Sequence, residues 1–359
     1  MTFSRATAPS TPATPPSTGA PATWPPPTAS AASAHALVEP TLRLLTTELE
    51  RQQTGYDTGV QAMGREAVLP PGKLLRPVLL VEAAAAVGMP PADAVPAALS
   101  VEYLHVGALC HDVIDGDALR RGRPTVAARH GSPSAIVTGD LLIMASFQAL
   151  ADCTGRAVPA ARVLAVVRVL AAAGVDLCRG QVMEETLQAA SECSLSSYLK
   201  MVALKTSSLF RAAGMGGVLL AGGSGPERAA VRQFAEFLGQ ALQMSDDLLP
   251  YVSDTAQSGK PALSDMVNQC PTYPLLLCLQ NAGSADRTKI ADAISGVHPP
   301  EESFKTVCEV LTRTGTLEKA QSEARRQAAL AKESLLGLRP GPARETLAAV
   351  ADLCVDRQR

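Results

Sequence analysis

Apolar residues recur at helical spacing almost everywhere from His35 to the end of this 359-residue chain. Leu42, Leu45 and Leu49, with Leu44 beside them, are spaced as on one buried face of a helix. Similar faces recur at Val78–Ala86, Ala97–Ala108, Ile136–Ala151, Val163–Leu177, Tyr198–Leu220, Val231–Leu249, Pro274–Gln280 and Thr316–Leu336. Proline and glycine separate these segments, and the alternation typical of strands is almost absent. The sequence therefore predicts an all-α fold, a single bundle of about ten helices that fills residues 36–359 as one domain.

The first 35 residues consist mostly of proline, alanine, threonine and serine. Such a segment cannot bury enough apolar surface to offset the entropy of ordering, so we expect residues 1–35 to form a disordered tail. They lack the basic and then apolar plan of a signal peptide, and no uncharged apolar run reaches the roughly 18 residues that indicate a spanning helix. We therefore expect a cytoplasmic protein.

A formal net charge of -2 gives no electrostatic basis for binding nucleic acid or a membrane surface. Any polyanion must therefore be held by a local cluster of cations. The eight cysteines include no CxxC pair and no Cys/His spacing suited to zinc. We expect them to be reduced and to act as small core residues.

Two acidic clusters interrupt apolar helical segments, where a carboxylate is costly to bury. In the first, His111 and Asp115 lie one helical turn apart on the same face. In the second, Asp246 and Asp247 are adjacent, and Asp254 follows two turns later. A lone acidic pair usually marks a solvated face. Two pairs, each ending an apolar helix and preceding a glycine-bearing loop, favour a shared polar cavity.

Cations accompany these clusters along the chain. They are Lys73 and Arg76 at the start of one helix, Arg120 and Arg121 after the first acidic cluster, Lys205 in mid-chain and Lys260 after the second cluster. Arginine forks and lysine point charges suit the oxygens of a diphosphate. Carboxylates that bind magnesium would complete a diphosphate site.

With these motifs in this order, the chain resembles the polyprenyl synthetase family of trans-isoprenyl diphosphate synthases, which includes farnesyl and geranylgeranyl diphosphate synthases. The resemblance runs from about residue 40 to residue 290 and is weak from there to the C-terminus. The segments that carry it are Gly72–Pro77, Glu102–His105, Arg120–Thr125, Gly139–Leu142, Gly180–Glu184, Lys205–Phe210, Gln243 with Asp246 and Asp247, Gly259–Lys260 and Asp265.

The resemblance implies a helical bundle around a deep central cavity, assembled as a homodimer. It assigns the isopentenyl diphosphate to Lys73, Arg76, His105 and Arg121, the allylic diphosphate to Arg120, Lys205 and Lys260, up to three magnesium ions to Asp112, Asp115 and Asp246, and a place in the same site to Gln243. Among these, the catalytic set is Asp112, Asp115, Lys205, Gln243 and Asp246.

The implied reaction begins when the allylic carbon–oxygen bond ionises, while magnesium and the cations stabilise the charge on the departing diphosphate. The double bond of isopentenyl diphosphate then attacks the carbocation, and the released diphosphate takes the proton. The resemblance thus predicts a magnesium-dependent prenyltransferase that condenses isopentenyl diphosphate with an allylic diphosphate.

The chain departs from the family pattern at three positions. His111 stands where the family has the first aspartate of its first metal motif, and imidazole is a poor magnesium ligand. Pro250 replaces the last aspartate of the second motif, and Cys270 replaces a common lysine. Glu184 or Asp117 would be available as a substitute carboxylate.

These departures keep two other functions open. One is a terpene cyclase, or a prenyltransferase with another acceptor, for which the spacing of Asp246 and Asp254 roughly suits a cyclase metal helix. The other is a non-catalytic partner subunit, since His111 and Pro250 are both altered. The presence of Lys73 and Arg76, which would serve the second substrate, favours chain elongation.

In this family the product grows along the helix that carries the first acidic cluster. The residues four and five before His111 are Gly107 and Val106, and neither is large enough to stop growth at farnesyl. The first aromatic residue further down is Tyr103, about 12 Å before His111 at 1.5 Å per residue. Tyr103 is therefore predicted to close the tunnel, and geranylgeranyl diphosphate is the predicted product.

Overall fold

The computed structural model describes residues 29–55, 57–112, 119–120, 122–189, 193–252 and 272–356. Within these ranges the chain is helical almost throughout, which confirms the predicted all-α class. The helices are α1 (Ala29–Gln52), α2 (Gly59–Val68), α3 (Leu75–Ala86), α4 (Pro91–His111), α5 (Val126–His130), α6 (Ser132–Asp152), α7 (Ala160–Ala189), α8 (Leu195–Val202), α9 (Ser208–Ala221), α10 (Gly225–Val252), α13 (Tyr273–Asn281), α14 (Ser284–Ala293), α15 (Pro300–Arg313), α16 (Thr316–Ser334) and α17 (Pro342–Val355).

Three short helical turns and one small hairpin complete the described elements. Two of the turns are 3-10 helices, η1 (Cys153–Arg156) and η3 (Leu335–Gly337), and the third, η2 (Ala203–Ser207), is π-helical. The strands β1 (Leu119–Arg120) and β2 (Arg123–Pro124) pair antiparallel in a two-stranded hairpin. This hairpin follows α4, so it belongs to the region of the first acidic cluster.

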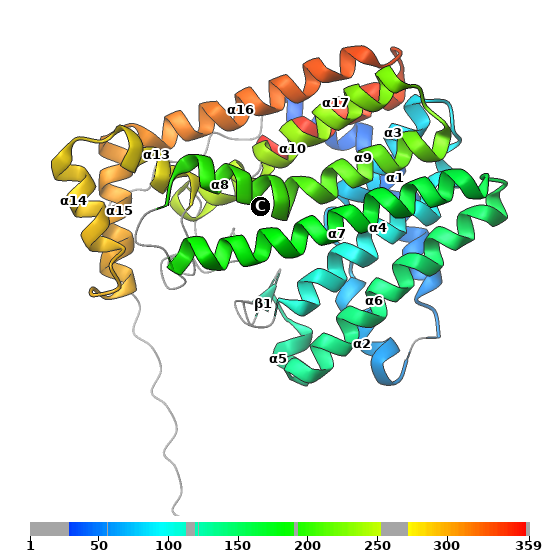
Figure 1. Cartoon of the computed structure of the whole chain (residues 1–359), viewed down its shortest axis with the longest axis horizontal. Helices are drawn as coiled ribbons and strands as arrows, with labels where there is room; N and C mark the ends of the chain where they lie inside the picture. Colours follow the sequence, from blue (N-terminus) through cyan, green and yellow to red (C-terminus); the bar gives the residue numbers. More distant parts are fainter. Residues whose placement is uncertain are drawn as a thin grey trace, which may run out of the picture.

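The helices form a bundle of long, roughly aligned rods (Figure 1). In this view α16, α17 and α10 run across the upper part, α9, α7 and α4 across the middle, and α6 below them, while α13, α14 and α15 cover one end. The apolar stripes face inward: Leu79, Phe210, Phe234 and Leu238 are completely buried. The bundle thus follows from burying one apolar stripe per helix.

Glycine allows the closest approach of two helices in the core. A Cβ placed on Gly217 of α9 would lie 2.2 Å from the carbonyl oxygen of Leu80 and 2.9 Å from the nitrogen of Ala84, both in α3. Only a residue without a side chain lets these backbones meet. The close packing brings Arg76, in the first turn of α3, against Phe210 of α9.

The N-terminal boundary differs from the prediction. Helix α1 begins at Ala29, so the predicted boundary between tail and domain at residue 35 falls inside it. Ala34 is only 3% exposed and Val38 is 2% exposed, because both pack into the core. The helical stripe therefore begins earlier than its alanine- and serine-rich composition indicated.

Helix α6 is the one helix in the described ranges that is long and apolar enough to span a membrane by length and composition alone. This is weak evidence, because core helices of a bundle meet the same criterion. In this structure α6 packs against α4, where a Cβ on Gly107 would lie 3.0 Å from the carbonyl oxygen of Gly139. The apolar character of α6 therefore serves, at least in part, this helix contact.

Candidate active site

Lys205 lies in the π-helical turn η2, between α8 and α9. Its ammonium forms an ion pair with the Glu184 carboxylate of α7, and both side chains are mostly buried. An extra residue inserted into a helical turn is frequently found at functional sites. Glu184, considered from the sequence as a substitute metal ligand, is thus engaged by a residue assigned to the allylic diphosphate.

Two glycines clamp this turn from either side. A Cβ on Gly180 of α7 would lie 2.5 Å from the backbone nitrogen of Lys205. A Cβ on Gly239 of α10 would lie 2.8 Å from the Cα of Ser207. Any side chain at either position would displace the turn, so the backbone on both sides of Lys205 is held by direct contact.

The second acidic cluster lies on α10 and its two aspartates face different surroundings. Asp246 is half-buried, one helical turn after the half-buried Gln243, so the two share a face of α10. Asp247 is only 8% exposed and accepts hydrogen bonds from Tyr198, Gln243 and Tyr273. Asp246 is therefore the more accessible carboxylate of this pair.

The amide of Gln243 joins this cluster to the π-helical turn. Its Nε2 donates to Oδ1 of Asp247 at 2.8 Å, and its Oε1 accepts from Oγ1 of Thr206 at 2.8 Å. Pro250 lies within the last turn of α10, which continues to Val252.

The first acidic cluster ends α4, and His111 faces α6. Its Nε2 lies 3.1 Å from the carbonyl oxygen of Ile136 and 3.2 Å from Oδ1 of Asp140. The imidazole lies directly on Gly139, where a Cβ would come within 2.3 Å of Nε2. His111 is thus held by α6 through Nε2. Asp112 follows it as the half-buried residue that ends the helix.

The residues assigned to isopentenyl diphosphate meet where α3 begins. Nη1 of Arg76 lies 3.3 Å from Nε2 of His105 on α4, and the guanidinium carbon lies 4.4 Å above the ring of Phe210. Lys73 lies in the loop just before α3, and Nη1 of Arg123 binds that loop through the carbonyl oxygen of Leu69 at 2.9 Å. A guanidinium stacked on an aromatic face is oriented and loses little freedom when it binds an anion.

Several predicted residues fall outside the described part of the chain. They are Asp115, Asp117, Arg121, Lys260, Asp254, Asp265 and Cys270. Arg120 lies in β1. Their predicted roles stay predictions.

A cavity of about 610 Å³ lies between α4, α6 and α7. Its polar end is formed by His111, Asp112, Gln181 and Glu185. The rest of the lining is mostly apolar and comprises Leu104, Ala108, Ile143, Ser146, Phe147, Leu170, Ala171, Gly174, Val175, Leu177, Cys178 and Val182. The volume lies within the range of roughly 300–1,000 Å³ of small-molecule sites.

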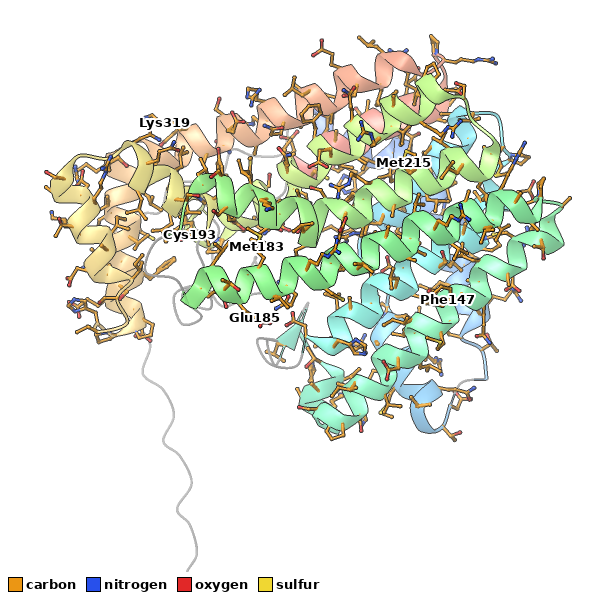
Figure 2. The ribbon with its side chains drawn as sticks, in the orientation of Figure 1. Phe147, Met183, Glu185, Cys193, Met215 and Lys319 are labelled. Carbon is orange, nitrogen blue, oxygen red and sulfur yellow. The ribbon has the colours of Figure 1, made fainter. Side chains whose placement is uncertain are left out.

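The long axis of this cavity follows α7. Lining residues run from Glu185 back to Leu170, which is about 22 Å at 1.5 Å per residue. Figure 2 shows Glu185 near one end of α7 and Phe147 toward the far end of α6. Since Gly139 of α6 meets His111 and Ile143 meets Gly107, the two helices run antiparallel, which places Phe147 near Leu104 at the end of the cavity away from His111.

The residues predicted to set product length lie elsewhere. Tyr103 is 3% exposed, and its hydroxyl donates to Oε1 of Gln52 at 2.7 Å. Val106 lines a separate cavity of about 170 Å³ between α2, α4 and α5, and Gly107 packs against α6. Tyr103 therefore does not line this cavity, and its role in product length stays a prediction.

Sequence reasoning also missed residues that shape the site. Tyr198 donates to Asp247, Asp140 and Gly139 contact His111, and Gly239 packs on Ser207, two residues after Lys205. Of these, only Gly139 and Asp140 belonged to a quoted family segment, and the sequence gave no sign of their contact with His111. No local pattern marks Tyr198 or Gly239.

The donor set agrees with magnesium in part. Asp112 and Asp246 offer carboxylate oxygens, which magnesium prefers, and it usually keeps several waters and phosphate oxygens as further ligands. His111 fits poorly, because imidazole is a poor magnesium ligand and its Nε2 already contacts α6. Within the described ranges no group of three or more His, Cys, Asp or Glu residues is arranged to hold a metal ion by itself.

Comparison with known proteins agrees with this site. Residues 58–311 match the polyprenyl synthetase family. The chain is 33% identical to a short chain isoprenyl diphosphate synthase of Methanothermobacter thermautotrophicus over 288 residues, covering 80% of this chain and 87% of the relative. It is also 33% identical to a (2E,6E)-farnesyl diphosphate synthase of Mycobacterium tuberculosis over 335 residues, covering 90% and 92%.

Solved structures show the same architecture. Geranylgeranyl pyrophosphate synthetase from Pyrococcus horikoshii matches with a TM-score of 0.82 at 26% identity, covering 91% of this chain and 99% of that one. A polyprenyl synthase from Caulobacter crescentus, complexed with calcium and isoprenyl diphosphate, matches with a TM-score of 0.79 at 28% identity, covering 92% and 97%. The helical bundle, the ordered motifs and these relatives together show that the chain belongs to the polyprenyl synthetase family of trans-isoprenyl diphosphate synthases.

Proposed function

We propose that this enzyme makes geranylgeranyl diphosphate and binds magnesium through Asp112, Asp115 and Asp246. Its family condenses isopentenyl diphosphate with allylic diphosphates and is magnesium-dependent. Relatives carry farnesyl, geranylgeranyl and octaprenyl names, so the family leaves the product length open. The proposal for length rests on the cavity between α4, α6 and α7.

The cavity supports growth past farnesyl. Its polar end holds Asp112, and its apolar lining continues along α7 for about 22 Å. Leu104, Phe147 and Leu170 form the far end and would stop the chain there. An apolar lining also keeps water away from the carbocation, which would otherwise be captured as an alcohol.

The protein groups have separate tasks in the proposed reaction. Lys205 and Arg120 hold the allylic diphosphate, while Arg76 and His105 hold isopentenyl diphosphate with Lys73. Magnesium, when bound, would neutralise the charge that develops on the leaving diphosphate. Fixed cations aimed at that charge lower the barrier because they need no reorganisation during the reaction.

We also propose a homodimer that forms through α6 and α7. Val137, Met144 and Phe147 on α6 are exposed apolar side chains, as are Val175 and Val182 on α7. Phe147, Val175 and Val182 also line the cavity, so a partner subunit bound here would cover its open side. Val137 and Met144 are seven residues apart, as are Val175 and Val182, so each helix carries one exposed stripe. Met144 is 59% and Val182 62% exposed, and contiguous apolar surface of this kind marks an interaction site.

The assay that tests the function uses purified protein, magnesium, and dimethylallyl, geranyl or farnesyl diphosphate, each with and without isopentenyl diphosphate. A geranylgeranyl product that requires isopentenyl diphosphate would support the proposal. Hydrocarbons formed without isopentenyl diphosphate would indicate a cyclase, and absence of turnover would indicate a non-catalytic subunit. Light scattering of the wild type and Met144→Lys tests the dimer, since a buried lysine should dissociate it.

A further inference from the structure

The network around Asp247 reaches the turn that carries Lys205. Oδ2 of Asp247 accepts from the hydroxyl of Tyr198 at 2.6 Å and from the backbone N–H of Tyr273 at 2.7 Å, while Oδ1 accepts from Gln243 at 2.8 Å. Three donors thus occupy both oxygens of a buried carboxylate. Such bonds offset the cost of removing the charge from water, so this aspartate serves the fold.

Each donor comes from a different part of the bundle. Tyr198 lies on α8, Gln243 on α10 with Asp247 itself, and Tyr273 in the first turn of α13. The N–H of Tyr273 is one of the groups that a helix start leaves without an intrahelical partner. Asp247 therefore joins three helices around one point.

The fixed carboxylate also fixes the orientation of Gln243. Because the Gln243 amide donates to Asp247 through Nε2, its Oε1 must face the other way, toward Thr206 of η2. The amide accepts the Thr206 hydroxyl at 2.8 Å. A continuous chain of hydrogen bonds thus leads from Tyr198 to the residue next to Lys205.

We infer that Tyr198 is a positioning residue that, through Asp247, Gln243 and Thr206, holds the π-helical turn and so places the Lys205 ammonium for the allylic diphosphate. The inference rests on the proposed role of Lys205. Gly180 and Gly239 limit the turn sterically, and the hydrogen-bonded chain fixes it within that space.

The surroundings of Tyr198 keep its hydroxyl a donor. Complete burial, followed by the nearby Asp247 carboxylate, raises the pKa of Tyr198 well above its ordinary value. The ring packs against Tyr273 with the centroids 6.1 Å apart. Removing the hydroxyl alone would therefore leave the ring packed and break only the first link of the chain.

Tyr198→Phe, with Tyr251→Phe as the matched control, tests the inference. Tyr251 is also buried in this bundle, and its hydroxyl lies 3.2 Å from Oγ1 of Thr272. In Tyr198→Phe we expect kcat to fall between about ten- and 100-fold, as for a small misplacement of a charged group. KM for isopentenyl diphosphate should stay within about twofold, because Arg76 and His105 are untouched. In Tyr251→Phe both constants should stay within about twofold.

Thr206→Val breaks the same chain at its other end. If the links act as one unit, Tyr198→Phe and Thr206→Val should each lower kcat, and the double variant should be hardly worse than either one alone. Additive losses would show that the two residues act separately and would overturn the inference.

Hydrogen exchange supplies a readout that does not need turnover. The amides of residues 203–207 should exchange faster in Tyr198→Phe than in the wild type and should be unchanged in Tyr251→Phe. If the wild type shows no turnover, the proposed function fails, while this measurement still decides whether Tyr198 holds the turn. Wild-type kcat and wild-type exchange in Tyr198→Phe would overturn the inference.

Discussion

The two acidic clusters differ in which residue type is held by the neighbouring helices. At the end of α4, His111 faces α6 and Asp112 follows it at the polar end of the cavity. On α10, Asp247 is buried among three donors while Asp246 is half-buried beside Gln243. In each pair one member is held by residues of other helices, and its half-buried neighbour is the proposed ligand of the substrate or metal. The member held in this way is a histidine in the first pair and a carboxylate in the second.

This difference gives the substitution at His111 a physical reason. A residue whose nitrogen lies 3.1 Å from a backbone carbonyl and 3.2 Å from Asp140 has to be a donor, which an ionised aspartate is not. The first cluster therefore has one carboxylate fewer than the family pattern, and its histidine contacts α6. We expect it to bind magnesium more weakly than the second cluster.

The largest expected effect is on turnover, and it distinguishes Asp246 from Asp247 in the second cluster. Asp246→Ala should lower kcat by at least the roughly 100-fold seen at the upper end for residues that support metal ligands, because it removes a proposed ligand itself. Its melting temperature should stay close to that of the wild type, since Asp246 is not fully buried. Steady-state kinetics and thermal denaturation check both statements, and an active Asp246→Ala protein would contradict the proposed metal site.

Asp247→Asn should show the opposite balance, with stability as the main loss. The asparagine would turn an NH₂ group toward donors that now meet a carboxylate, so we expect a loss of about 2–3 kcal/mol in the free energy of unfolding. Urea denaturation measures it. A matched Asp292→Asn on the exposed surface should change stability by less than about 0.5 kcal/mol. A stable Asp247→Asn protein would show that the buried network is not what holds these helices.

Residue type and motif order predicted the residues of the candidate site better than the residues that hold them in place. Lys205, Gln243 and Asp246 were identified because their motifs follow one another in the family's order, and the structure brings Lys205 and Gln243 to neighbouring turns. Tyr198 could not be predicted, because it meets Asp247 across 49 residues of sequence. Helical periodicity gives the buried face of each helix but not the helix that covers it.

The position of Tyr103 outside the larger cavity has a geometric cause. Eight residues carry a helix about 80° past two full turns, whereas seven residues fall only about 20° short of them. Leu104, seven before His111, therefore lies on the face that lines the cavity, and Tyr103 turns toward α1. The start of α1 was predicted several residues too late for a different reason, since alanine and serine are common both in disordered tails and in helices.

His111→Asp tests the first cluster with a smaller expected effect. The variant loses the donor to Ile136 and adds a charge near Asp140, so we expect stability to fall by about 1 kcal/mol. Because an added carboxylate is a better magnesium ligand than imidazole, the magnesium needed for half-maximal rate should also fall. Titrations of rate against magnesium and thermal denaturation measure the two changes.

Asp140→Asn serves as its partner variant. Combined with His111→Asp it should recover most of the lost stability, because the neighbouring like charge is removed while the new ligand remains. Unchanged stability and unchanged magnesium requirement in His111→Asp would mean that position 111 contributes neither to the α4–α6 contact nor to the metal site.

The last prediction compares two faces of α4 by the length of the product, and it involves the smallest expected change in the free energy of unfolding. Ala108 lines the larger cavity and Val106 the smaller one, two residues away on the same helix. Ala108→Phe should fill part of the growth path and shorten the product to farnesyl diphosphate or below, while Val106→Phe should leave the product unchanged. Chromatography of the products from geranyl and isopentenyl diphosphates measures both.

Phe147→Ala should lengthen the product, because it opens the far end beyond Leu104. If Val106→Phe shortened the product and Ala108→Phe did not, growth would follow the other face of α4, and the first cluster would serve the smaller cavity.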